Sequence, residues 1–425
     1  MAIRILPPED FLEARVTLPL SKSMSARALV ISALTEGAPL PSPVSRCDDT
    51  DALVKALSDP TATDINVGAA GTTMRFLTAY YAARPGHLPV RLDGSERMRQ
   101  RPIGTLVEAL RTLGADIEYE GEEGFPPLLI RGKALEGGTL DIDASVSSQY
   151  ISALLMVAPL MARGLRLNLR GEIASKPYIR MTLRMMEDAG IESDMTPDTV
   201  TVPHGTYTLP ADPRPIEGDW SGAAVWYETE ALAAGIITID NLAVHDSVQG
   251  DSRLADIYSR LGVVTEAEGD EGVPELTANP DPDARAVIDF SDCPDLAQCV
   301  TVTCAMLGIP FRFSGLGTLA IKETDRVEAL RRELAKIGVG IEIPAPGFME
   351  WDGRRRPVTE LPEFDTYDDH RMAMCLAPVA LYMPGIIINN PEVVSKSYPE
   401  FWTQFESAGF TLLDPSVTPD PQPES

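Results

Sequence analysis

The chain has 425 residues, of which 44% are hydrophobic and 23% charged; this composition is typical of globular proteins, and the length favours two or more domains. The formal net charge is −27, and a surface so rich in carboxylates repels nucleic acid and anionic membranes, so we expect neither as a partner. No stretch approaches the roughly 20 apolar residues of a membrane span, and the first ten residues hold no run suited to a signal peptide. The five cysteines show no metal-ligand spacing, so we expect reduced thiols, a cytoplasmic location and no metal.

A helical pattern that ends in a glycine recurs along the chain. In its first copy, residues 101–119, apolar side chains fall on one helical face, and a short strand-like run follows the glycine. We expect each glycine to cap its helix in the left-handed conformation. The copies are 76, 72, 76 and 71 residues apart, and their glycines are Gly114, Gly190, Gly262, Gly338 and Gly409. So regular an interval predicts a repeated α/β module.

The N-terminal segment departs from this pattern. A helix is predicted over residues 21–37, but only one short strand, ARVTLPL, precedes it. The N-terminus is therefore a candidate to complete a module that the C-terminal half otherwise forms. We expect one discontinuous domain of residues 1–20 and 216–425, and a second domain of residues 21–215. Residues 414–425 are rich in proline, serine and aspartate, and we expect them to be a disordered tail.

Polar segments that bear a lysine or an arginine precede several of the predicted helices. The helix dipole disfavours a cation at that end, unless the cation helps the free backbone N–H groups to bind an anion. One such charge is equally well explained as a solvated residue beside an ordinary cap. Six at corresponding points of repeated modules favour anion binding; they are Lys22, Arg101, Lys322, Arg326, Arg371 and Lys396.

Three further segments resemble parts of a binding site. Gly68 and Gly71, in a turn before a helix, allow a ligand to approach the backbone closely, but no GKT or GKS follows, which makes a P-loop unlikely. Asp295 precedes an apolar helix and is either a general base or an ordinary cap. Another predicted helix begins at Ser147, Ser148 and Gln149. The hydroxyl and amide groups of these residues are suited to binding phosphate, but ordinary helix capping explains them as well.

The segments PLSKSMSARAL, GAAGTTMRF, RPIG, SVSSQYISALLM, SKPYI, EGDWS, IKETDR, DDHRMAM and SKSYP, in this order, resemble the EPSP synthase family of enolpyruvyl transferases. The resemblance extends over about residues 18–401 and implies an α/β fold, a two-domain inside-out α/β barrel. This fold has six βαβαββ repeats, with pseudo-threefold symmetry in each domain. It further implies a monomer that needs no cofactor.

The activity implied by the resemblance joins phosphoenolpyruvate to the 5-hydroxyl of shikimate 3-phosphate through a tetrahedral ketal and releases phosphate, in the pathway to chorismate and aromatic amino acids. The implied contacts to shikimate 3-phosphate are Lys22, Ser23, Arg27, Ser147, Ser148, Gln149, Ser175, Tyr178, Asp295, Thr318 and Lys322. The implied contacts to phosphoenolpyruvate are Lys22, Gly71, Arg101, Gln149, Arg326, Arg371 and Lys396. Asp295 resembles the base, Glu323 the proton donor to the methylene carbon, and Lys22 a group that shares in proton transfer.

Three positions depart from the family's usual pattern. Ala69 and Phe76 stand where asparagine and proline are usual, and Thr318 stands where asparagine is common. None of these departures removes a charge, so we expect altered affinity and retained activity.

Two alternatives stay open from the residues. A transferase acting on UDP-N-acetylglucosamine is expected to have a Lys-Asn pair near its start and a cysteine in a glycine-rich loop, whereas this chain has Lys22-Ser23 and no such cysteine. An inactive anion-binding homologue is the second alternative, although the residues implied in proton transfer are all present.

Overall fold

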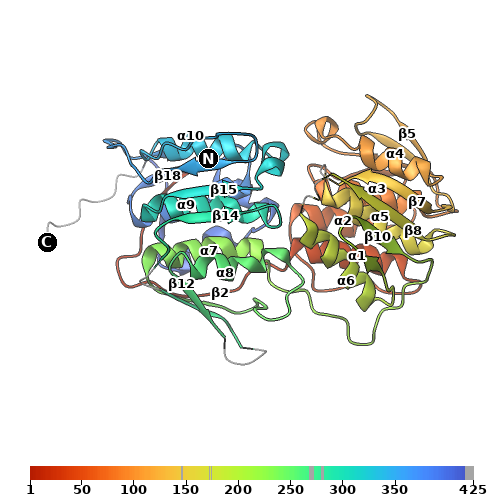
Figure 1. Ribbon diagram of the computed structural model, residues 1–425, viewed down its shortest axis with the longest axis horizontal. Helices are drawn as coiled ribbons and strands as arrows, with labels where there is room; N and C mark the ends of the chain where they lie inside the picture. Colours follow the sequence, from red (N-terminus) through yellow and green to blue (C-terminus); the bar gives the residue numbers. More distant parts are fainter. Residues whose placement is uncertain (145–146, 172, 174, 268–271, 279–281, 417–425) are drawn as a thin grey trace. The chain divides into compact units, whose positions relative to one another are not determined.

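The computed structural model describes residues 1–144, 147–171, 173, 175–267, 272–278 and 282–416 (Figure 1). The predicted tail lies outside these ranges from residue 417 onward. The chain divides into two compact units: unit 1 comprises Met1–Pro19, Gly218–Ser247 and Asp251–Ser425, and unit 2 comprises Leu20–Glu217 and Val248–Gly250. Within the described ranges, no helix is both long and apolar enough to cross a membrane.

Unit 2 alternates helices with short strands. Its helices are α1 (Lys22–Leu34), α2 (Asp48–Ser58), α3 (Gly71–Ala82), α4 (Gly104–Thr112), α5 (Ser148–Val157) and α6 (Lys176–Asp188). Its strands are β3 (Asp64–Asn66), β4 (Val90–Asp93), β5 (Asp116–Tyr119), β6 (Leu128–Arg131), β7 (Gly138–Asp143), β8 (Leu165–Arg170), β9 (Asp194–Met195) and β10 (Thr199–Val202).

Unit 1 combines the N-terminal strands with the C-terminal half of the chain. Its helices are α7 (Trp220–Ala233), α8 (Leu254–Ser259), α9 (Ala297–Leu307), α10 (Arg326–Ala335), α11 (His370–Leu376) and α12 (Phe401–Ser407). Its strands are β1 (Ala2–Leu6), β2 (Glu13–Val16), β11 (Ile236–Ile239), β12 (Val263–Glu266), β13 (Glu275–Ala278), β14 (Ala286–Asp289), β15 (Phe311–Ser314), β16 (Met349–Trp351), β17 (Glu363–Phe364), β18 (Ile386–Asn389) and β19 (Thr411–Leu413).

The sheets share one strand order. In β3-β4-β6-β5 and β7-β8-β10-β9, the first two strands are parallel and the other pairs are antiparallel, as a βαβαββ repeat requires. Unit 1 repeats this order in β2-β11-β13-β12 and β17-β18-β1-β19, so the N-terminal strands complete two of its sheets. The sheet β14-β15-β16 has isolated bridges at Val339 and Glu342 in place of a further strand. The described residues thus form five sheets, and α1 and α2 have no sheet of their own among them.

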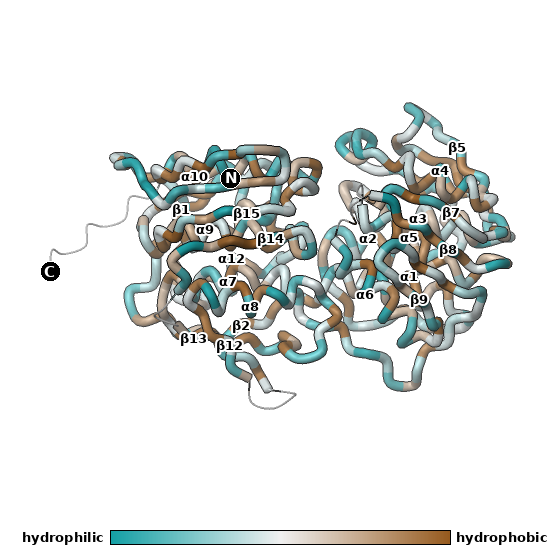
Figure 2. The backbone as a smooth tube through the Cα atoms, viewed as in Figure 1, coloured by the Kyte–Doolittle hydropathy of each residue, from teal (hydrophilic) through white to brown (hydrophobic). Residues whose placement is uncertain are grey.

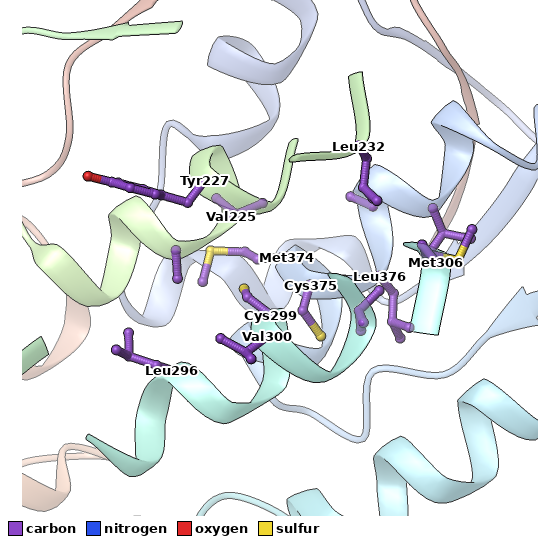
Figure 3. Packing of buried hydrophobic residues seen from close by; sticks show 14 of the residues in the cluster. Val225, Tyr227, Leu232, Leu296, Cys299, Val300, Met306, Met374, Cys375 and Leu376 are labelled. Atoms are coloured by element: carbon purple, nitrogen blue, oxygen red, sulfur yellow. The ribbon is translucent and has the colours of Figure 1, made fainter. Parts of the chain in front are cut away.

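Three helices in each unit pack against one another: α7, α9 and α11 in unit 1, and α1, α3 and α5 in unit 2. Nearly all side chains of α7, α9 and α11 are buried, and most of them are apolar. Figure 3 shows part of this core, in which Val300, Met374 and Leu376 pack together. Each unit has its own cluster of buried hydrophobic residues, and Figure 2 shows hydrophobic residues along its helices and strands. All five cysteines are buried free thiols, as predicted.

The five repeated glycines cap their helices as predicted. Their φ angles are 104°, 82°, 101°, 81° and 99° in chain order. After four of them, the next N–H donates to the carbonyl five residues earlier; one example is Val339 N to Leu334 O at 3.0 Å. This bond turns the chain out of the helix and into the sheet.

Replacing Gly338 with alanine should destabilise unit 1 much more than replacing Gly308. Both glycines have positive φ, 81° and 73°, so alanine costs about 1 kcal/mol at either position from backbone strain. At Gly338, however, the added Cβ would lie 2.1 Å from Arg356 O, whereas at Gly308 it meets no atom within 4 Å. The measurement is urea unfolding followed by tryptophan fluorescence, because all four tryptophans lie in unit 1. Equal losses of stability would contradict the steric argument.

Candidate active site

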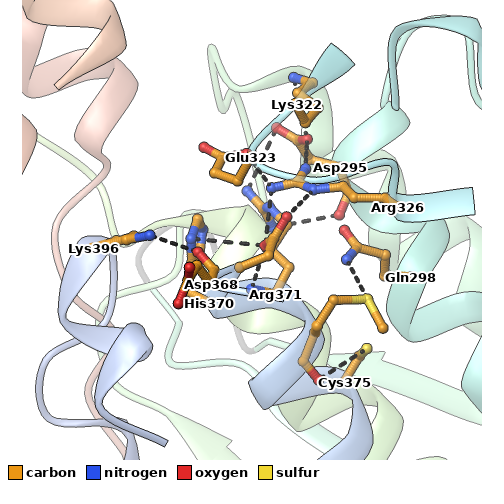
Figure 4. A network of polar contacts seen from close by, with 12 residues as sticks. Asp295, Gln298, Lys322, Glu323, Arg326, Asp368, His370, Arg371, Cys375 and Lys396 are labelled. Atoms are coloured by element: carbon orange, nitrogen blue, oxygen red, sulfur yellow. Dashed lines mark hydrogen bonds and ion pairs between the residues drawn. The ribbon is translucent and has the colours of Figure 1, made fainter. Parts of the chain in front are cut away.

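Unit 1 gathers predicted site residues at the starts of its helices. Asp295 lies in the 3₁₀ helix Pro294–Leu296, which leads into α9, and Arg371 is the second residue of α11. Lys322 and Glu323 lie in the segment before α10, whose N-cap is Asp325 and whose first residue is Arg326. Figure 4 shows these side chains pointing toward one another. Helix starts that lie far apart in the sequence therefore supply one cluster within this unit.

The guanidinium group of Arg326 is the centre of this cluster. Its Nη1 donates to Asp295 Oδ1 at 2.8 Å, its Nη2 to Glu323 Oε2 at 2.9 Å, and its Nε to Asp369 Oδ2 at 2.7 Å (Figure 4). The Arg326 side chain is only 2% exposed. Burial alone would lower its pKa, but attraction from these three carboxylates raises the pKa of Arg326 overall. One permanently charged group thus holds both carboxylates that we predict to transfer protons.

Asp295 is surrounded by cations. Besides Arg326, Lys322 Nζ lies 3.4 Å from its Oδ1, and Arg371 Nη2 lies 3.5 Å from its Oδ2. Arg371 also donates to two carbonyl oxygens, those of Asp295 and Ser221, at 3.4 and 3.5 Å. Burial opposes the charge of Arg371, yet Asp295 raises its pKa overall. This arrangement concentrates positive charge around one carboxylate.

The loop that precedes α11 contains a strained turn. Tyr367 and Asp368 both have positive φ, 54° and 55°, and the carbonyl of Asp368 accepts a hydrogen bond from Lys396 Nζ at 2.5 Å. The buried carboxylate of Glu333 anchors the turn by accepting from Tyr367 Oη at 2.6 Å and from Asp365 N at 3.0 Å. Left-handed non-glycine residues cluster at functional sites, because the surrounding contacts must offset their strain.

The glycine-rich turn of unit 2 lies against two arginines. A Cβ on Gly71 would be 2.6 Å from Arg101 Nη1 and 2.8 Å from Arg75 Nη1, so only glycine fits with the guanidinium groups in these positions. Arg75 donates to Gly71 O at 2.7 Å. Burial, and then repulsion by Arg101, lower the pKa of Arg75 to about 10, which leaves Arg75 charged at neutral pH. Two adjacent cations at the start of α3 favour an anionic ligand.

Two predicted residues of unit 2 connect to the same turn, Gln149 directly and Lys22 through Asp49. Gln149 Nε2 donates to Thr72 Oγ1 at 3.1 Å, and Thr72 N donates to Asp49 Oδ1 at 3.3 Å. Lys22 Nζ forms an ion pair with Asp49 Oδ2 at 3.6 Å. Asp49 therefore links the starts of α1 and α3, since it contacts a residue of each.

Arg27 is buried among hydroxyl and carbonyl groups. Its Nε donates to Thr182 Oγ1 at 2.7 Å, and its Nη2 donates to Ser152 Oγ at 3.0 Å and to Tyr178 O at 3.2 Å. Its guanidinium carbon lies 5.5 Å from the ring centre of Phe76. Burial lowers the pKa of Arg27 to about 10. Arg27 thus connects α1, α5 and α6.

Ser147, Ser148 and Ser175 lie at the starts of α5 and α6. Ser147 Oγ accepts from Gln149 N at 3.2 Å, which is ordinary helix capping, and Ser148 is buried. Ser175 has a φ of 55° and makes no capping bond through its side chain. Thr318, by contrast, belongs to unit 1, where its buried Oγ1 makes no hydrogen bond with the described residues.

Sequence reasoning missed three residues of these clusters and a fourth, Asp251, that lies beside them. Asp369 and Arg75 lie within the segments DDHRMAM and GAAGTTMRF, but no local pattern shows which residues contact them. Asp49 is one of several acidic residues in the first turn of α2, and nothing in the local pattern singles it out. Among the described residues, no group of three or more histidine, cysteine or acidic side chains is placed to hold a metal ion.

The chain resembles known proteins over almost its whole length. A family model described as EPSP synthase (3-phosphoshikimate 1-carboxyvinyltransferase) matches residues 55–405. A protein of Bacteroides fragilis named 3-phosphoshikimate 1-carboxyvinyltransferase is 47% identical over 416 residues, which cover 96% of this chain and 98% of that protein. One of the same name from Idiomarina loihiensis is 34% identical, with 94% and 97% covered.

The fold also matches a solved structure. The EPSP synthase of Acinetobacter baumannii aligns with a TM-score of 0.76 at 20% identity, covering 97% of this chain and 100% of that one. This confirms the predicted fold class. On the family match and the 47% identical relative, the chain belongs to the EPSP synthase family.

Proposed function

We propose that the chain transfers the enolpyruvyl group of phosphoenolpyruvate to the 5-hydroxyl of shikimate 3-phosphate, giving 5-enolpyruvylshikimate 3-phosphate and phosphate. The observation that carries the proposal is the Arg326 cluster, in which one guanidinium group holds two carboxylates beside Lys322 and Arg371. The reaction needs this combination, because both substrates are anions and two protons must move. Nothing in the clusters or the relatives favours UDP-N-acetylglucosamine as the acceptor.

The proposed mechanism assigns one proton transfer to each carboxylate. Asp295 takes the proton of the 5-hydroxyl as its oxygen attacks C2 of phosphoenolpyruvate, and Glu323 gives a proton to C3, which yields the tetrahedral ketal. The ketal then loses phosphate from C2 as Asp295 returns its proton to the leaving phosphate, while the ionised Glu323 takes back a proton from the methyl group, which forms the vinyl ether. Lys322, Arg326 and Arg371 stabilise the negative charge that the phosphate carries as it leaves.

Other residues are proposed to bind the two substrates. We propose that Ser23, Arg27, Ser147, Ser148, Gln149, Ser175, Tyr178, Thr318 and Lys322 contact shikimate 3-phosphate. For phosphoenolpyruvate we propose Gly71, Arg101, Gln149, Arg326, Arg371 and Lys396, with Lys22 serving both substrates. The crowding of Arg75 and Arg101 against Gly71 supports the second set. A monomeric state and a cytoplasmic location stay predictions from the sequence, and size-exclusion chromatography tests the first.

The direct test mixes the purified chain with both substrates and follows phosphate release together with formation of the vinyl ether. We expect one phosphate for each vinyl ether formed. Phosphate release without shikimate 3-phosphate, or none with both substrates present, would contradict the proposal. Turnover with UDP-N-acetylglucosamine would support the sister activity, and binding of both substrates without turnover would support an inactive homologue.

Replacing Gly71 with alanine should raise the KM for phosphoenolpyruvate about tenfold or more, because the new methyl group displaces Arg101 and costs at least one ionic hydrogen bond of about 1.5 kcal/mol. Stability should change little, since the displaced atoms are the ends of flexible side chains. Steady-state kinetics test the prediction. Gly340→Ala is the control, because a Cβ there meets no atom within 4 Å. An unchanged KM in Gly71→Ala would show that the position of Arg101 does not matter.

A further inference from the structure

Asp251 is a buried carboxyl group that interacts electrostatically with the proposed base. It lies in the 3₁₀ helix Gly250–Arg253 and is 3% exposed. Ser221 Oγ, in the first turn of α7, donates a hydrogen bond to its Oδ2. Its Oδ1 is buried and makes no hydrogen bond with any described residue. A buried carboxyl oxygen without a partner is costly and calls for an explanation beyond packing.

The charged groups around Asp251 come from every element packed against it. Asp295, ahead of α9, and Asp219, ahead of α7, repel its negative charge, while Arg371 of α11 attracts it. Arg253 and Cys293 interact with each other, and Asp251 acts electrostatically on Cys293 as well. Contacts connect the two carboxyl groups through Arg371: its Nη1 donates to the carbonyl of Ser221, the residue hydrogen-bonded to Asp251, at 3.5 Å, and its Nη2 lies 3.5 Å from Asp295 Oδ2. Asp251 and Asp295 thus repel each other and share the attraction of Arg371.

A negative charge near Asp295 would make it a better proton acceptor. Lys322, Arg326 and Arg371 all favour the ionised form of Asp295, and this weakens it as a proton acceptor. A nearby negative charge acts in the opposite direction, since it repels the ionised form. We propose that Asp251 is a positioning residue for the transfer reaction, which makes Asp295 a stronger base by repelling its charge and by sharing Arg371. This inference rests on the proposed function, because it concerns the proton that Asp295 takes.

The charge of Asp251, and with it the strength of the proposed base, depends on pH. Burial, and then repulsion by Asp295, raise the pKa of Asp251 to about 7, although Ser221 and Arg371 lower it. Below pH 7, Asp251 is neutral and leaves Asp295 a weak base; above pH 7, it is charged and strengthens that base. Burial raises the pKa of the Cys293 thiol to about 12, so Cys293 stays neutral through this range. The turnover number should therefore rise as the pH passes through about 7.

The test compares kcat against pH, at saturating substrates, for the unchanged chain and for Asp251→Asn. Asparagine keeps the shape and can still accept the hydrogen bond from Ser221. We expect kcat of the unchanged chain to rise about threefold to tenfold through neutral pH, the gain expected when a base strengthens by about one pKa unit. The variant should stay at the lower value throughout, with both KM values within about twofold. If kcat of Asp251→Asn still rose near neutral pH, the inference would be overturned. A decrease in kcat by the same factor at all pH values would also overturn it.

Asp256→Asn is the matched control. Asp256 is exposed on the neighbouring helix α8, and its replacement makes the same change in net charge. We expect this variant to keep the step near neutral pH. Loss of the step in both variants would assign it to net charge and would overturn the role of Asp251.

A second measurement does not depend on turnover. Carboxyl ¹³C signals of labelled aspartate are followed against pH, and the Asp295 signal is assigned by its loss in Asp295→Asn. We expect this signal to show a second inflection near pH 7, which is lost in Asp251→Asn. Absence of that inflection in the unchanged chain would overturn the inference. Its presence in a chain that releases no phosphate would contradict the proposed function and leave the coupling of the two carboxyl groups established.

Discussion

Replacing Asp295 with asparagine is expected to lower kcat about a thousandfold, while both substrates still bind. General base catalysis contributes on the order of 10²- to 10⁴-fold, and the amide keeps the shape of the side chain without accepting the proton. Arg326 remains held by Asp369, through contacts of 2.7 and 3.2 Å, so the cation cluster should stay in place. Phosphate release measures the turnover, and calorimetric titration measures the binding.

The control for this variant is Asp292→Asn. Asp292 lies three residues before Asp295 in the same segment, so its replacement makes the same chemical change close by. We expect its turnover within about twofold of the unchanged chain, as for a residue that makes no contact with the reacting groups. Near-normal turnover in Asp295→Asn would remove Asp295 as the base.

Replacing Arg326 with glutamine should abolish turnover and lower the free energy of unfolding of unit 1 by about 3–5 kcal/mol, since removing one partner of a buried ion pair leaves an uncompensated charge. Asp369, which is 0% exposed, would lose its buried partner, and Asp295 and Glu323 would lose their common cation. Tryptophan fluorescence during urea unfolding reports on unit 1 alone, because all four tryptophans lie there.

A double variant separates the structural role of Arg326 from its chemical role. In Arg326→Gln with Asp369→Asn, both buried charges are removed, and the asparagine can still cap α11, so at least about half of the lost stability should return. Turnover should not return, because Asp295 and Glu323 still lack their common cation. Arg332→Gln, on the exposed face of α10, is the control and should change stability by less than about 0.5 kcal/mol. Recovery of turnover in the double variant would show that Arg326 acts only through stability.

The sequence predicts where the repeated helices end and most of the charged groups, because these depend on local chemistry. The helix predicted over residues 21–37 ends at Leu34. A glycine that must take a positive φ after an amphipathic helix is readable from its neighbours, and all five repeated glycines do so. The polar helix starts are also local, since Lys322, Arg326 and Arg371 lie at or beside them. The resemblance of the motifs supplies the fold class and the family, both of which are confirmed.

The partners of these groups depend on the packing of helices from different repeats. Arg326 contacts Asp369, 43 residues further along the chain, and Asp295, 31 residues before it. Asp49 contacts Lys22 of α1 and Thr72 of α3, and no local pattern distinguishes it from its acidic neighbours.

The sequence by itself therefore determines that cations and capping groups stand at the starts of repeated helices, and which family the chain belongs to. Only the tertiary structure decides that one buried guanidinium group holds three carboxylates, and that Asp251 is connected to the proposed base through Ser221 and Arg371. The physical reason is that capping and backbone conformation act within a few residues. Ion pairing and burial, in contrast, act between side chains that only the packed helices bring together.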